Sequence, residues 1–475
     1  MARVAHATGL SARPVAVDRS AVALVFAAAT IALIFAVAFV VPRPLWSTQA
    51  SGPPAGADLS AASLGWPGAV LALAFGLAWA VPFRPYLLAV RLVEHDFERV
   101  RLLLVLTAVL ATVTLLIYPA FGSDIFMYIA YARQWAVYGD NPLLATPALH
   151  PADWSYAFAW ARTQPSPYGP LWALITWPIA VLGGDSALAL VLAYKALSLV
   201  AYGACCWLVW ACAPLPRRAY ALLYFAWSPL VLFEVLGKVH NDILLALAVL
   251  VAVRLDGARG MIVAALGGLV KVSGLAILPA LATHLVRLRR WRPLVVGLAV
   301  TALTIAAFYA PFWRGLETLG PVFVQTNRVV WSPGSLLIAA GVDPSAARLA
   351  LGLIWAVACT LITVRVRDGA TSAALTLLAT LLLLTTAFFA HYLVPVIALA
   401  ALSPSRLLRT TVLALSVGAL VAYATELLAP ALPPGWLGSP SYQVVGSLVT
   451  LTPAVLALGA AAKRRATPTL AAGSG

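Results

Sequence analysis

The chain has 475 residues, of which 63% are hydrophobic and only 10% are charged. A soluble protein of this length does not have enough interior to bury that share of apolar side chains. The composition therefore excludes a soluble globular protein and predicts that lipid surrounds most of the chain.

The apolar runs are long and do not alternate with polar residues, as in 21–41. In hydrocarbon every backbone polar group needs an internal partner, so only helices and closed barrels can cross a membrane. Runs without a two-residue period exclude a barrel and indicate helices. We therefore expect an all-α polytopic membrane protein with a bundle of about 13 to 14 transmembrane helices.

The formal net charge of +15 raises the question of a nucleic-acid partner. The basic residues, however, gather in short loops between the apolar runs, at 84–101, 217–218, 254–259, 287–292, 365–367, 406–409 and 463–465. This is the positive-inside pattern, reinforced by anionic lipids of the inner leaflet. The charge thus predicts a multi-pass protein of a bacterial plasma membrane, with both ends in the cytoplasm and no nucleic-acid partner.

Starting from a cytoplasmic N-terminus, the hydropathy and charge patterns predict one transmembrane domain, 1–465, and a cytoplasmic tail, 466–475. The predicted spans are 21–41, 64–82, 103–119, 187–212, 219–236, 242–255, 294–311, 347–364, 372–389, 392–404, 410–428 and 443–462. With these spans all the basic loops lie on the cytoplasmic side. The loop that starts at residue 120, after the third span, lies on the outer side.

Two further apolar stretches are not predicted as simple crossings. If 170–183 crossed the membrane, Arg217 would lie outside, so we expect this stretch to be interfacial or re-entrant. Residues 260–286 lie between two inside basic clusters and need an even number of crossings, and Lys271 stands at their middle. They are expected to form a broken-helix hairpin with Lys271 at its outward tip, where irregular backbone must line a polar cavity or be buried in protein.

Two extracytoplasmic loops are expected, 121–168 and 312–346. The first is the longest polar excursion of the chain, and loops of that length in compact proteins are usually functional. Within it, the spacing of apolar and aromatic residues over 124–138 predicts a helix in the membrane interface, anchored by Tyr128, Tyr131 and Trp135.

With this topology the unusual polar residues fall on the outer face, and ionisable groups at membrane depth are costly and usually functional. They are Asp124, Glu234, Lys238, His240, Asn241, Asp242, Lys271, Arg328, His391 and Tyr392.

Simpler explanations exist for several of these residues. Glu234 and Lys238 stand in the favourable i,i+4 order and can neutralise each other. His240 alone is more often an interface histidine than a catalyst, and Asn and Asp at a helix start often serve as caps. Asp124 can also cap the helix after it, which is compatible with a catalytic role. Lys271 has no acidic neighbour in sequence, so an anion is its simplest partner.

These residue types suit the transfer of a group from a phosphate leaving group. A carboxylate such as Asp124 can take a proton from an acceptor hydroxyl. Cations such as Lys271 and Arg328 can stabilise the charge that grows on the departing phosphate. Nucleotide sugars and ATP are not available outside the cytoplasm, so an activated donor there has to be linked to a lipid. Aromatic residues of the first loop, such as Trp160 and Tyr168, offer flat faces for sugar rings.

Four segments in order are similar to one known group of enzymes: YPAFGSDIFMYIAYARQWAVYGDNPL, PSPYGPLW, WSPLVLFEVLGKVHNDILLAL and GGLVKVSGLAILP. Over roughly residues 100–400 the chain resembles the GT-C superfamily of membrane glycosyltransferases, especially the bacterial polyprenol-phosphate-mannose-dependent mannosyltransferases of the glycosyltransferase 87 group. The resemblance implies a GT-C-like fold with its active site in the first extracytoplasmic loop.

The resemblance also implies roles for residues. The family's catalytic base maps onto Asp124, its P-x-YGP stretch onto 165–170, its His-Asn-Asp turn onto 240–242 and its broken-helix lysine onto Lys271. Taken together, the predicted catalytic residues are Asp124 and His391, and the predicted ligands of the donor phosphate are Lys271, Arg328 and Lys238. The predicted substrate-binding residues are Tyr128, Tyr168, His240, Asn241, Asp242 and Tyr392.

Some members of the superfamily carry a second acidic residue in the first loop that binds a metal, whereas Ile125 and Phe126 follow Asp124 here. No Walker A, GxGxxG or HExxH motif is present either. We therefore expect no cofactor, with a divalent metal as the less favoured alternative. We also expect an inverting transfer, most simply of mannose, from a polyprenyl-phosphate donor to a glycan or glycolipid acceptor. The alternative function is a transporter or flippase for a lipid or small anion, although the sequence shows none of the internal repeats common in transporters.

Overall fold

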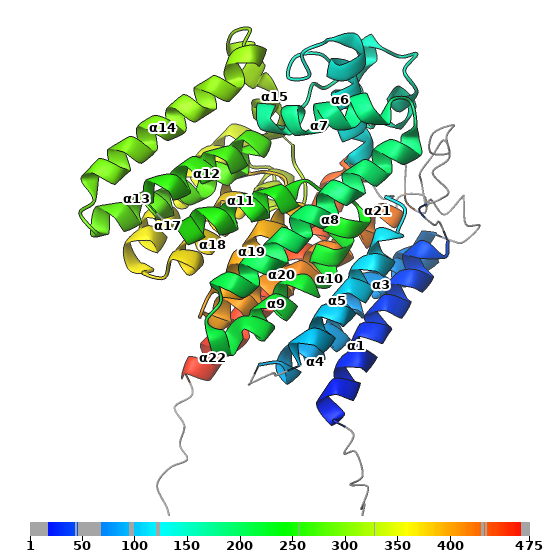
Figure 1. The fold of residues 1–475 in the computed structure, drawn as a ribbon, viewed down its shortest axis with the longest axis vertical. Coiled ribbons are helices and arrows are strands. Elements are labelled where there is room, and N and C mark those ends of the chain that lie inside the picture. The colour runs from blue at the N-terminus through cyan, green and yellow to red at the C-terminus, as the bar shows by residue number, and fades with distance from the viewer. Residues whose placement is uncertain are drawn as a thin grey trace, which may run out of the picture.

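The computed structural model describes residues 18–42, 45, 68–94, 99–119, 124–255, 257–326, 328–428, 432 and 435–466. Over these residues the regular secondary structure is helical, and an isolated bridge pairs Val330 with Ala387. Figure 1 shows the helices as one elongated bundle. The predicted all-α polytopic fold is confirmed. The expected tail beyond residue 466 and the loop residues 121–123 lie outside the described residues.

The first helices largely follow the prediction. Helix α1 (Arg19–Phe35) continues as a π-helical turn to Val40, and α5 (Val100–Leu115) occupies the third predicted span. The second span begins at α3 (Gly68–Ala80), and residues 64–67 lie outside the description. The basic stretch from residue 84 was expected to be a loop, but its first half is helix α4 (Phe83–Leu92). This helix forms because Phe83, Tyr86 and Ala89 bury one face while its arginines stay exposed.

The middle of the bundle contains one predicted span that is not continuous. Helices α8 (Ala187–Cys212) and α11 (Asp242–Leu255) match their predictions. The expected span 219–236 is instead α9 (Arg218–Ala226), α10 (Pro229–Val231) and the π-helical turn η6 (Leu232–Gly237), with a bend of 45° at the break. The cause is Pro229, which has no N–H to donate and disfavours helix in the residue before it.

The segment 260–286 is divided at Lys271. Helix α12 (Gly257–Val270) and helix α13 (Leu278–Arg287) are joined by the 3₁₀ turn η7 (Val272–Ile277). The two arms approach so closely that a Cβ on Gly274 would lie 2.5 Å from the backbone of Gly267. Only glycine permits such contact between backbones, and it holds the Lys271 turn against α12.

Helices α6 (Ile125–Tyr138) and α7 (Pro170–Gly183) lie together at one end of the bundle (Figure 1). Fourteen residues of helix span only about 21 Å, less than the roughly 30 Å of a bilayer core, so α7 is too short to cross as a straight helix. Helix α6 was expected to lie in the lipid interface. Its residues 125–134 are instead all buried, because α7 and the loop that follows α6 cover it.

The remaining apolar helices lie close to their predicted spans. They are α14 (Trp291–Tyr309), α17 (Pro344–Arg365), α18 (Gly369–Ala379) with the π turn η10 (Thr380–Leu384), α19 (Val394–Leu402), α20 (Arg406–Ala422) and α22 (Pro440–Ala466). The predicted span 372–389 is wrong at its C-terminal end, because residues 385–389 are not helical. Val330 donates to Thr386 and Phe388 donates to Val330, which pairs this segment with the second loop. That loop holds α15 (Gly320–Thr326) and α16 (Pro333–Ala339).

Among the described residues, seven helices are long and apolar enough to cross a membrane, or eight if the bent pair α9–η6 is one span. The expected 13 to 14 crossings are therefore not reached by long helices alone. Several of the others, such as α5 and α18 with its π turn, are apolar helices of 10 to 17 residues.

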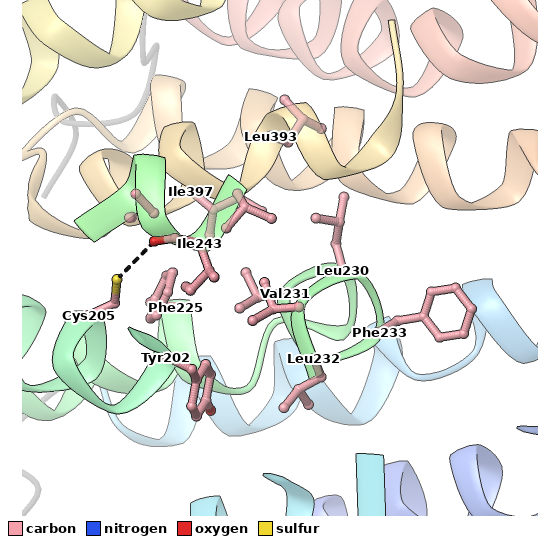
Figure 2. Close-up of a cluster of buried hydrophobic side chains, with 14 of the residues drawn as sticks. Tyr202, Cys205, Phe225, Leu230, Val231, Leu232, Phe233, Ile243, Leu393 and Ile397 are labelled. Atoms are coloured by element: carbon pink, nitrogen blue, oxygen red, sulfur yellow. Dashed lines mark hydrogen bonds between the residues drawn. The ribbon is translucent and has the colours of Figure 1, made fainter. Parts of the chain in front are cut away.

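The core lies between α8, α9, α10, α11 and α19. In Figure 2, Phe225, Val231 and Ile243 face one another there, and the Cys205 thiol donates to the Ile243 carbonyl at 3.7 Å. All four of these side chains are at most 2% exposed. This close packing supports the turns η6 and 238–241, which carry the polar residues of the site.

The basic loops lie near one another. Arg217 and Arg409 both donate to the carbonyl of Ser403, and Arg287 donates to that of Val366. In Figure 1 the start of α1 and the end of α22 lie at the end of the bundle opposite α6 and α7. The structure thus separates the basic loops from the first polar loop, as the positive-inside pattern requires.

This separation predicts that cysteines introduced at two exposed leucine positions react differently with an external thiol reagent. The test uses a variant whose native cysteines are replaced. Leu215, beside the basic loop, is 77% exposed, and Leu149, in the first polar loop, is 61% exposed. In intact cells, Leu149→Cys is expected to react with a membrane-impermeant thiol reagent, whereas Leu215→Cys reacts only after lysis. Equal labelling of both would contradict the topology.

Candidate active site

A cavity of about 320 Å³ lies among the loops at the α6–α7 end of the bundle. Of the residues predicted for the site, Asp124, Tyr168, Lys238, His240, Lys271, Arg328, His391 and Tyr392 line it. They come from parts of the chain up to 268 positions apart and meet because α11, α12 and α19 pack around the same core. Tyr128, Asn241 and Asp242 are not on the cavity wall and lie buried nearby.

The Asp124 carboxylate faces the cavity. Asp124 stands at the N-cap of α6, yet its side chain makes no capping hydrogen bond. Oδ2 accepts from the Tyr168 hydroxyl at 2.7 Å, and the side chain is 16% exposed. Of the two roles that the sequence left open, the geometry favours a carboxylate available to a substrate.

Tyr168 is held by the glycine that follows it. Gly169 donates to the Val270 carbonyl at 3.1 Å, and a Cβ on Gly169 would lie 2.1 Å from the Leu269 carbonyl oxygen. Any other residue here would push the loop away from the end of α12. The YGP sequence therefore docks the first loop beside Lys271 and brings Tyr168 to Asp124.

Tyr128 connects the first loop to the His-Asn-Asp turn. Its hydroxyl accepts from the backbone N–H of Asn241 at 3.3 Å, and its ring makes edge-to-face contacts with Tyr168 and Trp172. Tyr128 is buried, so it supports the site from behind.

The turn that carries Lys238 and His240 is irregular and well supported. Val239 has a φ of 65°, which is an outlier for a β-branched residue and indicates that the surroundings enforce the conformation. Buried Lys195 donates to the carbonyls of Leu236 and Gly237 at 2.8 and 3.1 Å. The carbonyls at the end of the π turn thus hold this lysine inside the bundle.

His240 and His391 stack face to face, with ring centroids 3.8 Å apart and planes 8° apart. His240 Nε2 lies 3.1 Å and Lys238 Nζ 3.7 Å from Glu234 Oε2. The predicted Glu234–Lys238 pair is therefore present, and the same carboxylate also faces both histidines, since His391 Nδ1 is 3.8 Å away.

Lys271 has a partner that sequence proximity could not reveal. Its ammonium donates to both carboxylate oxygens of Asp242, at 3.0 and 2.9 Å, across 29 positions of the chain. It also lies 4.2 Å from the centre of the Tyr392 ring. An ammonium has three N–H groups, so one remains for a ligand in the cavity. Asp242 is 1% exposed and serves as the counter-ion of Lys271 rather than as a surface ligand.

The cavity wall also holds Trp160, Tyr423 and Glu426, which were not among the predicted site residues. The Arg328 guanidinium lies over the Trp160 ring at 4.5 Å, and the Lys238 ammonium lies over the Tyr423 ring at 4.1 Å. Trp160 carried a signal as an aromatic residue of the first loop, and Glu426 carried one as a carboxylate at the outer end of a predicted span.

The first loop is braced by ionic contacts outside the cavity. Arg133 donates to Asp153 and Asp185, and the Tyr138 hydroxyl donates to Asp153 at 3.0 Å. Burial by itself raises the pKa of Asp153, but hydrogen bonds from Arg133 and Ser155 outweigh it and hold this pKa below its ordinary value. Because the folded-state pKa is lowered, the stabilisation is present at neutral pH and is lost as the pH falls through that value.

Asp124, His240 and His391 also raise the question of a metal ion, because ligand atoms of the three lie within 4.8 Å of one another. A metal binds imidazole nitrogen at about 2.0–2.1 Å, along the lone pair in the ring plane. With the two ring planes parallel and stacked at 3.8 Å, one ion cannot lie in both planes. The residues in this arrangement do not fit a metal bound by both histidines.

Comparison with known proteins places the chain in a family. The family model described as "Alpha-(1->6)-mannopyranosyltransferase, N-terminal domain" matches residues 22–287, more than half of the chain. The chain belongs to this family. The resemblance to membrane mannosyltransferases is thereby confirmed, and the match includes Asp124, His240 and Lys271, whereas Arg328 and His391 lie beyond it.

Two curated relatives are similar over part of their length. One, named alpha-(1->6)-mannopyranosyltransferase B, from Corynebacterium glutamicum, is 34% identical over 149 residues, which is 30% of this chain and 24% of the relative. The other, from Mycolicibacterium smegmatis and named a probable alpha-(1->6)-mannopyranosyltransferase, is 31% identical over 150 residues, 29% of this chain and 26% of the relative. The matches thus cover about a quarter of each relative. No solved structure matches the chain significantly.

The brace of the first loop leads to a prediction about stability. Arg133→Met leaves Asp153 buried without its main cation and is expected to destabilise the protein by about 3 to 5 kcal/mol, the usual cost of breaking a buried pair. A lower thermal unfolding midpoint in detergent and faster proteolysis of the first loop would show it. Arg162→Met, which removes an arginine of the same loop that donates to nearby carbonyls and lies over the Tyr156 ring, is the control and should change the midpoint little.

Proposed function

We propose that the chain is a membrane mannosyltransferase that moves mannose from a polyprenyl-phosphate donor to a glycan or glycolipid acceptor, with inversion and with Asp124 as base. The reaction takes place at the extracytoplasmic face of a bacterial plasma membrane. The observation that carries this proposal is the Asp124 carboxylate, which opens into a cavity that also holds Lys238, Lys271 and Arg328.

In the proposed reaction an acceptor hydroxyl approaches Asp124. Its oxygen bonds to the anomeric carbon while its proton passes to the carboxylate, and the bond from that carbon to the phosphate oxygen breaks. The electron pair leaves with the polyprenyl phosphate, whose charge Lys271, Arg328 and Lys238 stabilise. The Tyr168 hydroxyl donates to Oδ2 of Asp124, and this oxygen keeps a second lone pair for the acceptor's proton. Attack from the face opposite the phosphate turns a β-linked mannosyl donor into an α-mannoside.

The position and surroundings of the cavity support a lipid-linked donor. The cavity lies at the end of the bundle away from the basic loops, where nucleotide sugars are not available. An apolar recess of about 190 Å³ adjoins it at Val272 and Val322 and is walled by side chains such as Leu269, Leu275 and Ile305. Such a recess suits the first isoprene units of a donor whose phosphate faces Lys271.

The alternative, a transporter, has less support. Transporter sites lie near the bilayer midplane and open in turn to both sides, whereas this cavity lies at one end of the bundle. Towards the middle of the bundle, side chains such as Phe225, Val231 and Ile243 close the space between α8, α9 and α11 (Figure 2).

Replacing the proposed base tests the proposal. Asp124→Asn keeps the shape of the side chain but cannot take a proton, so mannose transfer from the lipid donor is expected to fall by about 100-fold or more. Donor binding, measured by a labelled polyprenyl-phosphate analogue, should remain. Asp140→Asn, in the same loop but off the cavity wall, is the matched control. Full activity of Asp124→Asn would remove Asp124 from this role.

The absence of a metal from the proposed mechanism is tested by chelation. Because the stacked histidines do not fit a shared ion and three side-chain cations line the cavity, purified enzyme treated with EDTA is expected to keep its rate. A loss of transfer that Mn²⁺ or Mg²⁺ restores would show that the mechanism includes a metal.

A further inference from the structure

Glu234 is a buried carboxylate that has no part in the proposed transfer. It is 0% exposed and does not line the cavity. A buried charge of this kind is expensive and persists where cations or hydrogen-bond donors surround it. The groups that face it are Lys238 and His240 from the following turn, His391 from the 3₁₀ turn before α19, and Tyr423 from the end of α20.

The π-helical turn places this carboxylate under His240. The backbone N–H of His240 donates to the Glu234 carbonyl at 3.0 Å and that of Lys238 to Phe233 at 2.8 Å. These bonds fold the chain back so that residues six apart lie together. Ser198 holds the same turn through the Val235 carbonyl at 2.8 Å. π-Helical turns of this kind are frequent at functional sites.

His240 stands between two carboxylates. Its Nε2 is 3.1 Å from Glu234 Oε2, an ionic contact that is not aligned as a hydrogen bond, and its Nδ1 is 3.7 Å from Asp124 Oδ2. A carboxylate beside one ring nitrogen favours the proton on that nitrogen, which leaves the other nitrogen as an acceptor. The contact with Asp124 is longer than a hydrogen bond, and such catalytic contacts often shorten when substrate binds.

We propose that Glu234 is a positioning residue that fixes the Nε2–H tautomer of His240, so that Nδ1 accepts the proton which Asp124 has taken from the acceptor. This inference rests on the proposed role of Asp124 as base. It assigns the second half of the cycle, the return of Asp124 to its ionised form, to a Glu234–His240 pair.

The proton balance is simple. After transfer, Asp124 carries the acceptor's proton as a carboxylic acid. The Oδ2–H bond breaks, the proton joins the lone pair of His240 Nδ1, and Asp124 is again a carboxylate. The imidazolium that forms is stabilised by the negative charge of Glu234, and it then releases the Nδ1 proton to water in the cavity, which His240 lines. The stacked His391 ring limits the pair to one added proton, because two parallel imidazoliums 3.8 Å apart would repel each other.

The experiment compares Glu234→Gln with Ser198→Ala in the purified full chain. Both change the support of the same turn, but only the first removes the charge beside His240. For Glu234→Gln we expect kcat to fall by about 10- to 100-fold with the KM for the donor unchanged. The pH below which kcat falls should be lower in this variant, because the His240 imidazolium has lost the negative charge that stabilised it. Ser198→Ala should keep the wild-type kcat and the wild-type dependence of kcat on pH.

A second variant separates a proton carrier from a structural residue. In His240→Gly the ring is missing from the cavity wall, and added imidazole is expected to restore part of the lost kcat in proportion to its free-base concentration. A merely structural histidine would not be rescued in this way.

The outcomes distinguish this inference from the proposed function. Two results would show that the Glu234–His240 pair does not return Asp124 to its ionised form. One is a wild-type kcat and pH profile in Glu234→Gln, and the other is a failure of imidazole to rescue His240→Gly. In both cases an inactive Asp124→Asn would still support Asp124 as the base. If Glu234→Gln does not fold, the rescue of His240→Gly still decides. If Asp124→Asn is fully active, the proposed function itself fails.

Discussion

The site depends on one constraint, that charged groups in a lipid-embedded bundle need partners within the protein. Glu234 meets this need through Lys238, and Asp242 meets it through Lys271, whose carboxylate–ammonium contact of 2.9 Å joins the start of α11 to the tip of the α12–α13 hairpin. The Lys271–Asp242 pair brings two distant segments together, and the Glu234–Lys238 pair lies within the turn that leads to His240, so the pairs shape the cavity as well as neutralise it.

Breaks in regular helix make these pairings possible. The π turn before Lys238, the 3₁₀ turn after Lys271 and the extended residues 385–389 before His391 each interrupt an apolar segment at the same depth. A straight helix would direct these side chains into lipid or into the core. The closely packed apolar layer beside the turns (Figure 2) supports their irregular backbone.

Much of this arrangement can be predicted from the sequence, because hydropathy and positive charge act locally. The long helices, the break at Lys271 and the gathering of polar residues at one end follow from such patterns. What the sequence could not show depends on contacts between distant residues. The partner of Lys271 is 29 positions away, the bend at Pro229 shifts Glu234 beneath His240, and the burial of α6 comes from α7. The stacking of His240 on His391, 151 positions apart, likewise needs the fold.

The most direct test of the central claim is a comparison of two donors with the purified protein. The same oligomannoside acceptor is incubated either with radiolabelled β-mannosyl polyprenyl phosphate or with radiolabelled GDP-mannose. Label is expected to move only from the lipid donor, and the new linkage is expected to be α. Transfer from GDP-mannose, or a β-linked product, would contradict the central claim.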